Sequence, residues 1–436
     1  MIRGYAILYF SRTLYFTFRG LIEERDEMII YDRWMESNLQ EALQTWRVVS
    51  IAGARQCGKT TLAKRLPTKT ILPRSLDSET FLQAASEDPQ SFVQHPVGTT
   101  LFIDEIQKEP RLLPAIKSAV DTSNRPGQFL LTGSSHLKAI PGVTESLAGR
   151  LHTIRLHTLT EGEFRGGKPD FPARAFSGEF PSRLTGGTKR EIVESAFRGG
   201  YPEPARIREI YRPVWHRDYL EQLLTHDIAD VAQIRKVGKL RDLFLFLAAR
   251  SSKLWNTSEI ATLLEISKVS VENYIAALEA MYLFDRVPSW TGGDYDRVVK
   301  RPKWFIGDTG TMCAVLKWKQ AEVMLDGDRS GKLIESWVYH ELSAAVGANA
   351  GYEIFHYRDR EQREVDFLLE NNAGELVGIE VKAGSVVRKD DFKSLLWFQR
   401  TLGGTRYRRS IVLYSGADTL SFGDGLLAVP LASLFC

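Results

Sequence analysis

A glycine-rich loop between an apolar segment and a helical pattern constrains this chain more than any other feature. Residues 46–52 read WRVVSIA, a β-branched and apolar stretch that predicts a buried strand. GARQCGKT follows at 53–60, and TLAKRL then begins a helix. Glycines let backbone N–H groups curl around a phosphate, and the first turn of the helix adds partial positive charge. The sequence therefore predicts a phosphate-binding loop at the edge of an α/β sheet.

The spacing Gly53-x-x-x-x-Gly58-Lys59-Thr60 is the Walker A pattern. In such a loop Lys59 is expected to reach the β- and γ-phosphates of ATP, and the Thr60 hydroxyl is expected to bind Mg²⁺. ATP and Mg²⁺ are thus the expected cofactors, and a glycine-rich turn without a ligand is the alternative. The expected ATP-binding residues are Gly53, Ala54, Arg55, Gln56, Cys57, Gly58, Lys59, Thr60 and Thr61.

A second apolar strand, LFIDE at 101–105, ends in two carboxylates. Asp104 is expected to hold Mg²⁺ through water, and Glu105 to polarise the water that attacks the γ-phosphate. A later strand ends in LTGSS, so Ser134 or Ser135 would sense hydrolysis if that strand lies between the other two. A helix N-cap would explain the same serines without catalysis. ATP hydrolysis is the expected reaction, with Lys59, Glu105 and Ser134 as catalytic residues.

Several stretches together resemble one family. GARQCGKTTL, LFIDEIQ, LLTGSS and ESLAGRLHTIRLHTLTEGEF look like the AAA+ ATPases of bacteria and archaea that carry a C-terminal domain of unknown function. The resemblance runs from about Met28 to the C-terminus and implies a homo-oligomeric ring, most often of six subunits. It also implies an arginine that acts on a neighbouring subunit's ATP. Arg150 lies where such a finger would be, and a structural or solvated arginine is the alternative.

Length and pattern predict several domains, because 436 residues exceed what one hydrophobic core usually organises. The strand–helix alternation stops near Glu161, and a Gly- and Pro-rich stretch follows. The expected fold class is α/β, with a parallel AAA+ sheet and flanking helices, a helical winged-helix middle and an α/β PD-(D/E)xK-like end. The expected parts are an extension of uncertain status at 1–27, the ATPase domain at 28–165, a linker and helical segment at 166–235, a winged-helix-like domain at 236–302 and a nuclease-like domain at 303–436.

Composition predicts a cytoplasmic protein with no membrane partner. Hydrophobic residues make up 43% and charged residues 25%, and no long uncharged apolar run occurs. The N-terminal stretch begins like a signal peptide, but Arg12 interrupts it and Arg19 closes it, so no export signal is expected. Three cysteines lie far apart, which indicates neither a disulfide framework nor a zinc site. The net charge of +3 decides little about nucleic acid.

The middle of the chain has a helix-turn-helix pattern with a weak DNA-reading face. The first helix starts near Thr257 or Ser258, either of which is a plausible N-cap. The second helix is expected to bury Val271, Tyr274, Ile275, Leu278 and Met281. Two acids on its exposed face would repel phosphates, so this module is expected either to contact DNA or to serve a structural or protein-binding role. The candidate DNA contacts are Lys268 and Asn273 on the helix and Arg297, Lys300, Arg301 and Lys303 on the wing.

The last segment resembles the PD-(D/E)xK nuclease fold, as the family resemblance implies. Asp366 is expected to end one strand of a hairpin, and Glu380 and Lys382 to share one face of its partner strand. In that fold Asp366 and Glu380 would bind a second Mg²⁺, Lys382 would orient or activate water, and Glu335 would assist from a helix. The same outline survives in proteins that only bind.

Three functions therefore remain open. The first is an AAA+ ATPase that couples ATP turnover to a DNA transaction or to remodelling of a partner. The second is an ATP-dependent nuclease, which the set Asp366, Glu380 and Lys382 favours. The third is a nucleotide-gated scaffold or switch in defence or stress signalling that cuts no strand, which the acidic second helix favours.

Overall fold

The computed structural model describes residues 30–66, 71–133, 147–228, 236–292 and 301–436. The chain divides into residues 1–32 and residues 33–436, and the following description concerns the second unit. The expected extension at 1–27 lies outside the described residues. Among the described helices, none has an apolar stretch long enough to cross a membrane.

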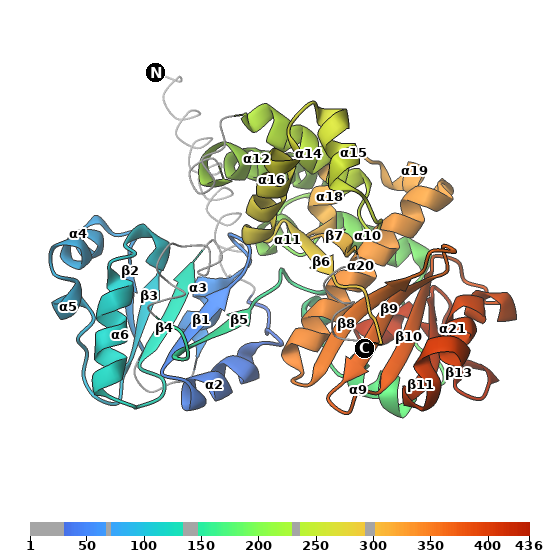
Figure 1. The fold of residues 1–436 in the computed structure, drawn as a ribbon, viewed down its shortest axis with the longest axis horizontal. Helices are drawn as coiled ribbons and strands as arrows, with labels where there is room; N and C mark the ends of the chain where they lie inside the picture. Colours follow the sequence, from blue (N-terminus) through green and yellow to red (C-terminus); the bar gives the residue numbers. More distant parts are fainter. Residues whose placement is uncertain (1–29, 67–70, 134–146, 229–235, 293–300) are drawn as a thin grey trace, which may run out of the picture. The chain divides into compact units, whose positions relative to one another are not determined.

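The first part of the unit is a parallel five-stranded sheet with strand order β2-β3-β4-β1-β5 (Figure 1). Its strands are β1 (Val48–Ala52), β2 (Ile71–Ser75), β3 (Thr100–Asp104), β4 (Phe129–Gly133) and β5 (Leu151–Arg155). All pairings are parallel. Every residue of β1, β3 and β4 is buried, as expected for parallel strands covered on both faces. The predicted hydrolysis sensor required the strand that ends in LTGSS to lie between the other two strands of the site. This order is confirmed, because β4 lies between β1 and β3.

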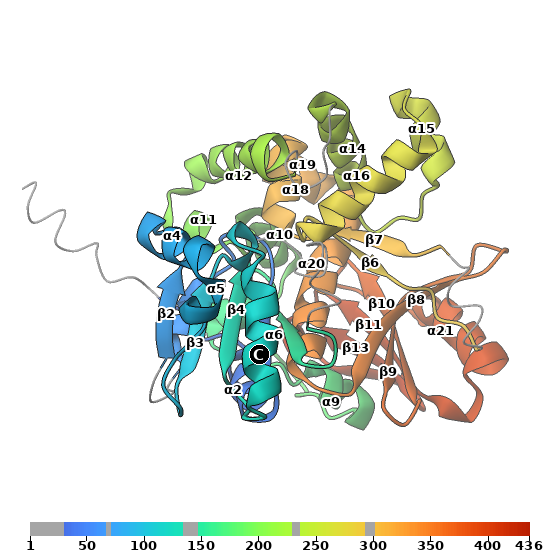
Figure 2. The ribbon, with the colours of Figure 1, turned by 60° about the vertical axis from the view of Figure 1, so that its left-hand side comes forward.

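Helices cover both faces of this sheet (Figure 2). They are α2 (Glu36–Thr45), α3 (Lys59–Arg65), α4 (Glu79–Glu87), α5 (Pro89–Phe92) and α6 (Leu112–Thr122). Successive residues of β3 point to opposite faces, as the two-residue period of a strand requires. Leu101 and Ile103 pack in a cluster with Ile116 of α6. Phe102 packs in the other cluster, with Leu39 of α2. Helices therefore cover both faces of the sheet, and the ends of its strands are left for a reaction site.

The Gly- and Pro-rich stretch after Glu161 differs from the expected linker. It forms α8 (Glu161–Arg165) and α9 (Phe171–Ser177), and α9 packs against strand β11 and helix α20 of the C-terminal part. Gly166 and Gly178 end these helices in left-handed conformation, so glycine here marks helix ends and not a flexible tether. The helical pattern after Lys189 is confirmed as α10 (Lys189–Arg198), α11 (Pro202–Arg206), α12 (Arg212–Gln222) and the π-helical turn η4 (Leu223–Asp227).

The described residues of the middle part form three helices and an antiparallel strand pair. The elements are α14 (Val237–Ala249), α15 (Thr257–Leu264), α16 (Lys268–Ala280), β6 (Phe284–Val287) and β7 (Lys303–Ile306). The expected buried face of α16 is confirmed. The N-cap prediction was wrong by one residue, because the Asn256 side chain accepts the Ser258 N–H at 3.0 Å and caps α15. The β6–β7 pair runs across the expected boundary at 302/303.

The C-terminal part is a mixed six-stranded sheet between helices. Its order is β12-β13-β11-β10-β9-β8, with β8 (Tyr352–Arg358), β9 (Glu364–Asn371), β10 (Leu376–Lys382), β11 (Tyr407–Tyr414), β12 (Leu420–Gly423) and β13 (Leu426–Pro430). Helix α20 (Gly327–Ala348) packs with Phe367 on one face, and α21 (Lys393–Phe398) packs with Leu368 on the other. Two further helices, α18 (Thr309–Val315) and α19 (Gln320–Leu325), precede α20. Asp366 lies near the start of β9, which corrects the expectation that it ends its strand.

Candidate functional site

The glycine loop leads from the end of β1 into α3, as predicted. Gly58 has φ 104° and is the residue before the helix, a conformation that side chains rarely adopt. At Gly53 an added Cβ would lie 2.2 Å from the Leu156 carbonyl oxygen. Both glycines are therefore required by the backbone path of the loop, one for its dihedral angle and one for close packing.

Lys59 is held against the loop itself. Its side chain is buried, and Nζ donates to the carbonyl oxygens of Gly53 at 2.9 Å and Ala54 at 2.8 Å. A buried ammonium needs such acceptors, and phosphate oxygens would be stronger ones because they are charged. The lysine is thus positioned on the strand side of the loop, ready to exchange carbonyl partners for phosphate.

The two residues predicted to bind magnesium with ATP lie together, Thr60 at the start of α3 and Asp104 at the end of β3. Thr60 Oγ1 donates to Asp104 Oδ1 at 3.0 Å, and Asp104 is buried. Sequence reasoning missed Thr132 on β4, whose hydroxyl also donates to Asp104 Oδ1. A hydroxyl and a carboxylate are the hard oxygen ligands that Mg²⁺ prefers, so the pair Thr60 and Asp104 fits this ion. Thr132 orients the carboxylate between them.

Glu105 follows in a backbone conformation that is uncommon for glutamate. Its φ is 58°, in the left-handed region. Its Oε2 accepts a hydrogen bond from Gln107 Nε2. Strained non-glycine residues concentrate at functional sites, where the surrounding structure maintains them. Glu105 thus keeps the position beside Asp104 that a water-polarising base needs, and its role stays a prediction.

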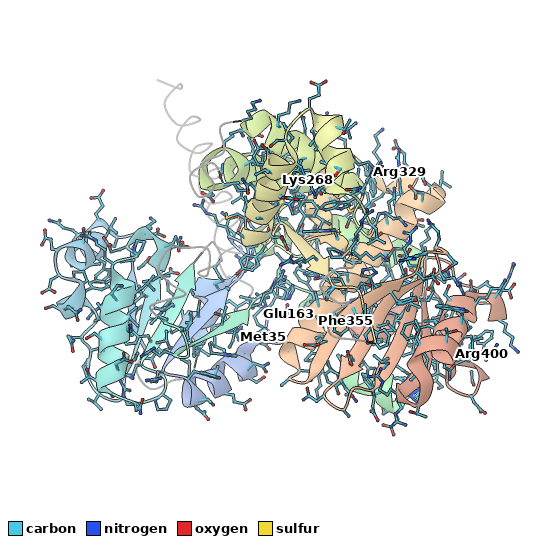
Figure 3. All side chains as sticks on the ribbon, viewed as in Figure 1. Met35, Glu163, Lys268, Arg329, Phe355 and Arg400 are labelled. Atoms are coloured by element: carbon cyan, nitrogen blue, oxygen red, sulfur yellow. The ribbon has the colours of Figure 1, made fainter. Side chains whose placement is uncertain are left out.

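Arg33 is a buried support of the loop that sequence reasoning missed. Its Nη1 donates to the Cys57 carbonyl at 2.8 Å and Nη2 to the His157 carbonyl at 2.6 Å, while Nε donates to Glu163 Oε1 at 3.0 Å. Figure 3 labels Glu163, which also accepts the Trp34 N–H at 2.8 Å. The planar guanidinium therefore joins the phosphate loop to the chain after β5. No motif marks Arg33, so nothing in the local sequence could have found it.

Replacing Arg33 with methionine should lower the free energy of unfolding by about 3–5 kcal/mol, because the buried Glu163 carboxylate would lose its charged partner. Both side chains of this pair are under a tenth exposed. Urea unfolding of the full chain measures the change. Arg190→Met is the matched control: its partner Glu194 lies in an exposed surface pair, which is worth at most about 1 kcal/mol. Equal losses in the two variants would contradict the assigned role.

A second contact on the loop comes from α12 and η4. Asp227 binds Arg55 Nη1 through both carboxylate oxygens, at 2.6 and 2.9 Å. The Tyr219 hydroxyl donates to the Arg55 carbonyl at 2.7 Å. Burial raises the pKa of Tyr219, so the hydroxyl keeps its proton and remains a donor. Sequence reasoning placed Arg55 in the loop but did not find either partner.

Arg150 lies at the amino ends of the strands, opposite the phosphate-binding loop of its own chain. Its carbonyl accepts the Val48 N–H, at the start of β1, whereas the loop follows the end of β1. The guanidinium pairs with Asp121 at 2.5 Å, with about a quarter of the side chain exposed. The predicted role of Arg150 therefore requires the nucleotide of another subunit and release from Asp121, and it stays a prediction. Ser134 and Ser135 lie outside the described residues.

The C-terminal carboxylates form a cluster with one residue that sequence reasoning missed. Ligand oxygens of Glu335 on α20 and of Glu364 and Asp366 on β9 lie within 4.8 Å of one another. Glu364 was overlooked, although it shares a strand face with Asp366 two residues later. Burial raises the pKa of Glu335 to about 7. The cluster thus holds negative charge away from water.

Lys303 lies at the centre of this cluster, which corrects the prediction that it contacts DNA. Its side chain is only 1% exposed, and Nζ contacts Glu335, Glu364 at 2.6 Å and Asp366 at 3.3 Å. Burial alone would lower the pKa of Lys303, but these carboxylates raise it well above its usual value. The basic run near the wing indicated an exposed lysine, but every residue of β7, including Lys303, is buried.

Glu380 and Lys382 adjoin the cluster on the neighbouring strand. Lys382 Nζ donates to Glu380 Oε1 at 3.0 Å, which confirms that the two share a face. The Val381 N–H donates to Asp366 Oδ2 at 2.9 Å. Burial, with the charge of Asp366, raises the pKa of Glu380 to about 8. The four expected nuclease-like residues are therefore brought together, whereas a metal ion among them stays a prediction.

The structure says less about the other residues predicted to contact DNA. Lys268 is exposed on α16 and pairs weakly with Glu272 at 3.7 Å (Figure 3). Asn273 and Arg301 are exposed. Arg297 and Lys300 lie outside the described residues. No single basic face is therefore established among the described residues of the middle part.

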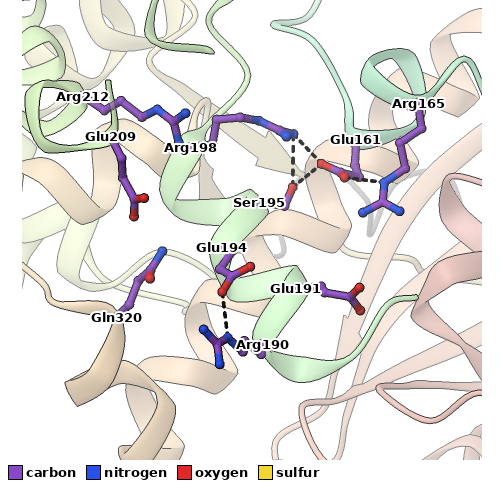
Figure 4. Close-up of a pocket in the computed structure, with 10 residues that line it drawn as sticks. All are labelled: Glu161, Arg165, Arg190, Glu191, Glu194, Ser195, Arg198, Glu209, Arg212 and Gln320. Atoms are coloured by element: carbon purple, nitrogen blue, oxygen red, sulfur yellow. Dashed lines mark hydrogen bonds and ion pairs between the residues drawn. The ribbon is translucent and has the colours of Figure 1, made fainter. Parts of the chain in front are cut away.

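A charged pocket of about 620 Å³ lies among α8, α10 and α12 (Figure 4). Glu161, which is buried, accepts hydrogen bonds there from Ser195, Arg165 and Arg198. Its lining combines Glu161, Glu191, Glu194 and Glu209 with Arg165, Arg190, Arg198 and Arg212, besides Ser195 and Gln320. Because acids and bases balance, this pocket favours no ligand of a single charge.

Comparison with known families divides the chain into three. Residues 45–165 match the family model described as an AAA domain. Residues 189–322 match the domain of unknown function DUF8612, and residues 330–434 match the domain of unknown function DUF4143. The AAA match spans all five strands of the first sheet, and the DUF4143 match spans most of α20 and all six strands of the C-terminal sheet.

Relatives match almost the whole chain. An uncharacterised protein of Mycobacterium tuberculosis is 26% identical over 92% of this chain and 84% of its own length. An uncharacterised protein of Haemophilus influenzae is 22% identical over 79% of this chain and 86% of its own.

Among solved structures, a RuvB variant of Thermotoga maritima is 20% identical, covering 61% of this chain and 93% of that one with a TM-score of 0.27. A signal-transduction ATPase with a tetratricopeptide sensor from Pyrococcus horikoshii is 14% identical, covering 73% and 48% with a TM-score of 0.22. The fold assignment rests on the strand order and the AAA match, since scores this low carry no argument. The chain therefore carries an AAA domain at 45–165 and a C-terminal DUF4143 domain at 330–434, the combination that the AAA+ resemblance implied.

Proposed function

We propose that this protein binds and hydrolyses ATP with Mg²⁺ and couples the turnover to a DNA transaction or to remodelling of a partner protein. The observation that carries the proposal is the contact of Thr60 Oγ1 with Asp104 Oδ1 at 3.0 Å, beside the buried Lys59. It joins the two halves of a Mg·ATP site, the start of α3 and the end of β3.

Each residue has a distinct task in the proposed reaction. Lys59 leaves its two loop carbonyls and neutralises the β- and γ-phosphates, and Thr60 and Asp104 hold the ion. Mg²⁺ supplies charge neutralisation on the phosphates. Glu105 takes up the proton of the attacking water. Arg150 of a neighbouring subunit stabilises the charge that develops on the γ-phosphate, so the active form is a homo-oligomer.

Mixing experiments test this arrangement. Arg150→Ala and Lys59→Ala subunits should each be inactive alone, yet their mixture should regain part of the Mg²⁺-dependent phosphate release, because one kind of interface pairs an intact loop with an intact Arg150. Phosphate release and sedimentation with ATP measure activity and assembly. A protein that stays monomeric with ATP at micromolar concentration and hydrolyses at full rate contradicts the role of Arg150.

A nuclease is the second candidate function, favoured by one specific observation. Glu335, Glu364 and Asp366 converge within 4.8 Å, and the pair Glu380 and Lys382 lies beside them. Carboxylates of this kind hold Mg²⁺ or Mn²⁺ at a scissile phosphate, with lysine orienting water. Cleavage assays on single-stranded, duplex and branched DNA, with each metal and with ATP or a non-hydrolysable analogue, decide between this candidate and a switch that cuts nothing.

A further inference from the structure

We propose that Lys303 is an internal cation that competes with a divalent metal ion for the carboxylates of Glu335, Glu364 and Asp366. The inference rests on the second candidate function only in taking these carboxylates as metal ligands. At issue is which cation occupies the site, the Lys303 ammonium or a metal ion, and this is independent of ATP hydrolysis.

The geometry places the ammonium where an ion would bind. Lys303 Nζ contacts an oxygen of each of the three carboxylates, and one ligand oxygen from each carboxylate lies within 4.8 Å of the other two. Metal–oxygen bonds to Mg²⁺ or Mn²⁺ are near 2.1 Å, so an ion bound to the same oxygens needs the volume that Nζ fills. The ammonium and the ion therefore exclude each other.

Lys303 is also confined there. Its side chain is 1% exposed and runs beside the rings of Phe305 and Phe367, with Nζ about 6 Å from each ring centre. A lysine without water must be paired, and three carboxylates provide the pairing. A lysine on the surface could move aside freely, but this one leaves only if its strand shifts or its partners open.

Charge around the cluster indicates that one ammonium does not complete it. Glu364 has a second partner, Arg358 at 3.4 Å, and Glu380 has Lys382. Glu380 Oε2 is nevertheless buried with no hydrogen-bond partner among the described residues. Lys382 and Arg358 thus share the neutralisation with Lys303, and one buried carboxylate oxygen beside the cluster still lacks a partner among the described residues. A divalent ion would supply twice the charge of the Lys303 ammonium.

Lys303 and its three carboxylate partners belong to different parts of the chain. Lys303 is the first residue of β7, which pairs with β6 after the helix-turn-helix of the middle part. The three carboxylates belong to α20 and β9. A shift of the β6–β7 pair would withdraw the ammonium and release the cluster for metal.

Metal binding by the full chain tests the proposal directly. Lys303→Met keeps the length of the side chain and removes its charge, so Mn²⁺ measured by calorimetry without nucleotide should bind at least about tenfold more tightly than to the wild type. Arg301→Met, an exposed change two residues earlier, should leave the affinity unaltered. Adding Glu364→Gln to Lys303→Met should remove most of the gain, which separates this site from Thr60 and Asp104.

Each outcome of the Mn²⁺ binding experiment either supports or overturns the proposed competition. Equal or weaker Mn²⁺ binding by Lys303→Met overturns the proposal. If this variant folds only with metal, Mn²⁺ should raise its melting temperature far more than that of the wild type. Failure to fold even in millimolar Mn²⁺ would overturn it as well, since the carboxylates would then accept no ion. Phosphate release from ATP, measured on the same samples, reports separately on the ATPase proposal.

Discussion

Replacing Lys59 with alanine should weaken ATP binding by about 10- to 150-fold, because each hydrogen bond from a charged donor is worth about 1.5–3 kcal/mol. The ammonium is buried and donates to the loop carbonyls of Gly53 and Ala54, where bound phosphate would replace them. Titration with a fluorescent ATP analogue in Mg²⁺ measures the dissociation constant.

Lys64→Ala is the control for this change, since Lys64 is an exposed lysine on the same short helix. It should bind the analogue as the wild type does. The role of Lys59 fails if Lys59→Ala binds within about threefold of the wild type, a difference smaller than the lower bound for one charged hydrogen bond.

Glu105→Gln should retain ATP but hydrolyse it at least about tenfold more slowly, because the amide has the shape of the carboxylate and cannot take up a proton. Its neighbour Asp104 keeps its contacts with Thr60 and Thr132, so metal binding should survive. Single-turnover hydrolysis of prebound ATP isolates the chemical step from nucleotide binding.

The same substitution at the exposed Glu79, near the start of α4, controls for a general effect of the amide. Glu79→Gln should hydrolyse at the wild-type rate. A wild-type rate in Glu105→Gln would sink its assignment as base, and a loss of ATP binding would instead point to a structural role for its left-handed backbone.

Much of the ATPase fold could be predicted because its signals are local. An apolar strand, a glycine loop and a helix follow one another within 20 residues, and the strand period and helix start need no distant partner. The strand order was not predictable from these signals alone. The predicted sensor required one particular order, with β4 between β1 and β3, and the sheet has this order.

The N-cap of α15 and the Gly- and Pro-rich stretch show where local signals mislead. Asn256 competes with two good capping residues directly after it, and only the helix geometry selects it. Gly166 and Gly178 were interpreted as linker residues, yet each ends a packed helix. Glycine supplies the same left-handed turn in both settings, so composition alone does not separate them.

The sequence by itself determined the chemistry of the strand ends: Lys59 and Thr60 where the loop enters α3, Asp104 at the end of β3 with Glu105 directly after it, and Glu380 with Lys382 on one strand face. Only the tertiary structure decided which distant residues serve them. Arg33 meets Glu163 across 130 positions, and Lys303 meets Glu364 across 61. The physical reason is that a buried charge is stable only beside its partner, and the fold brings that partner from a part of the chain that no local pattern indicates.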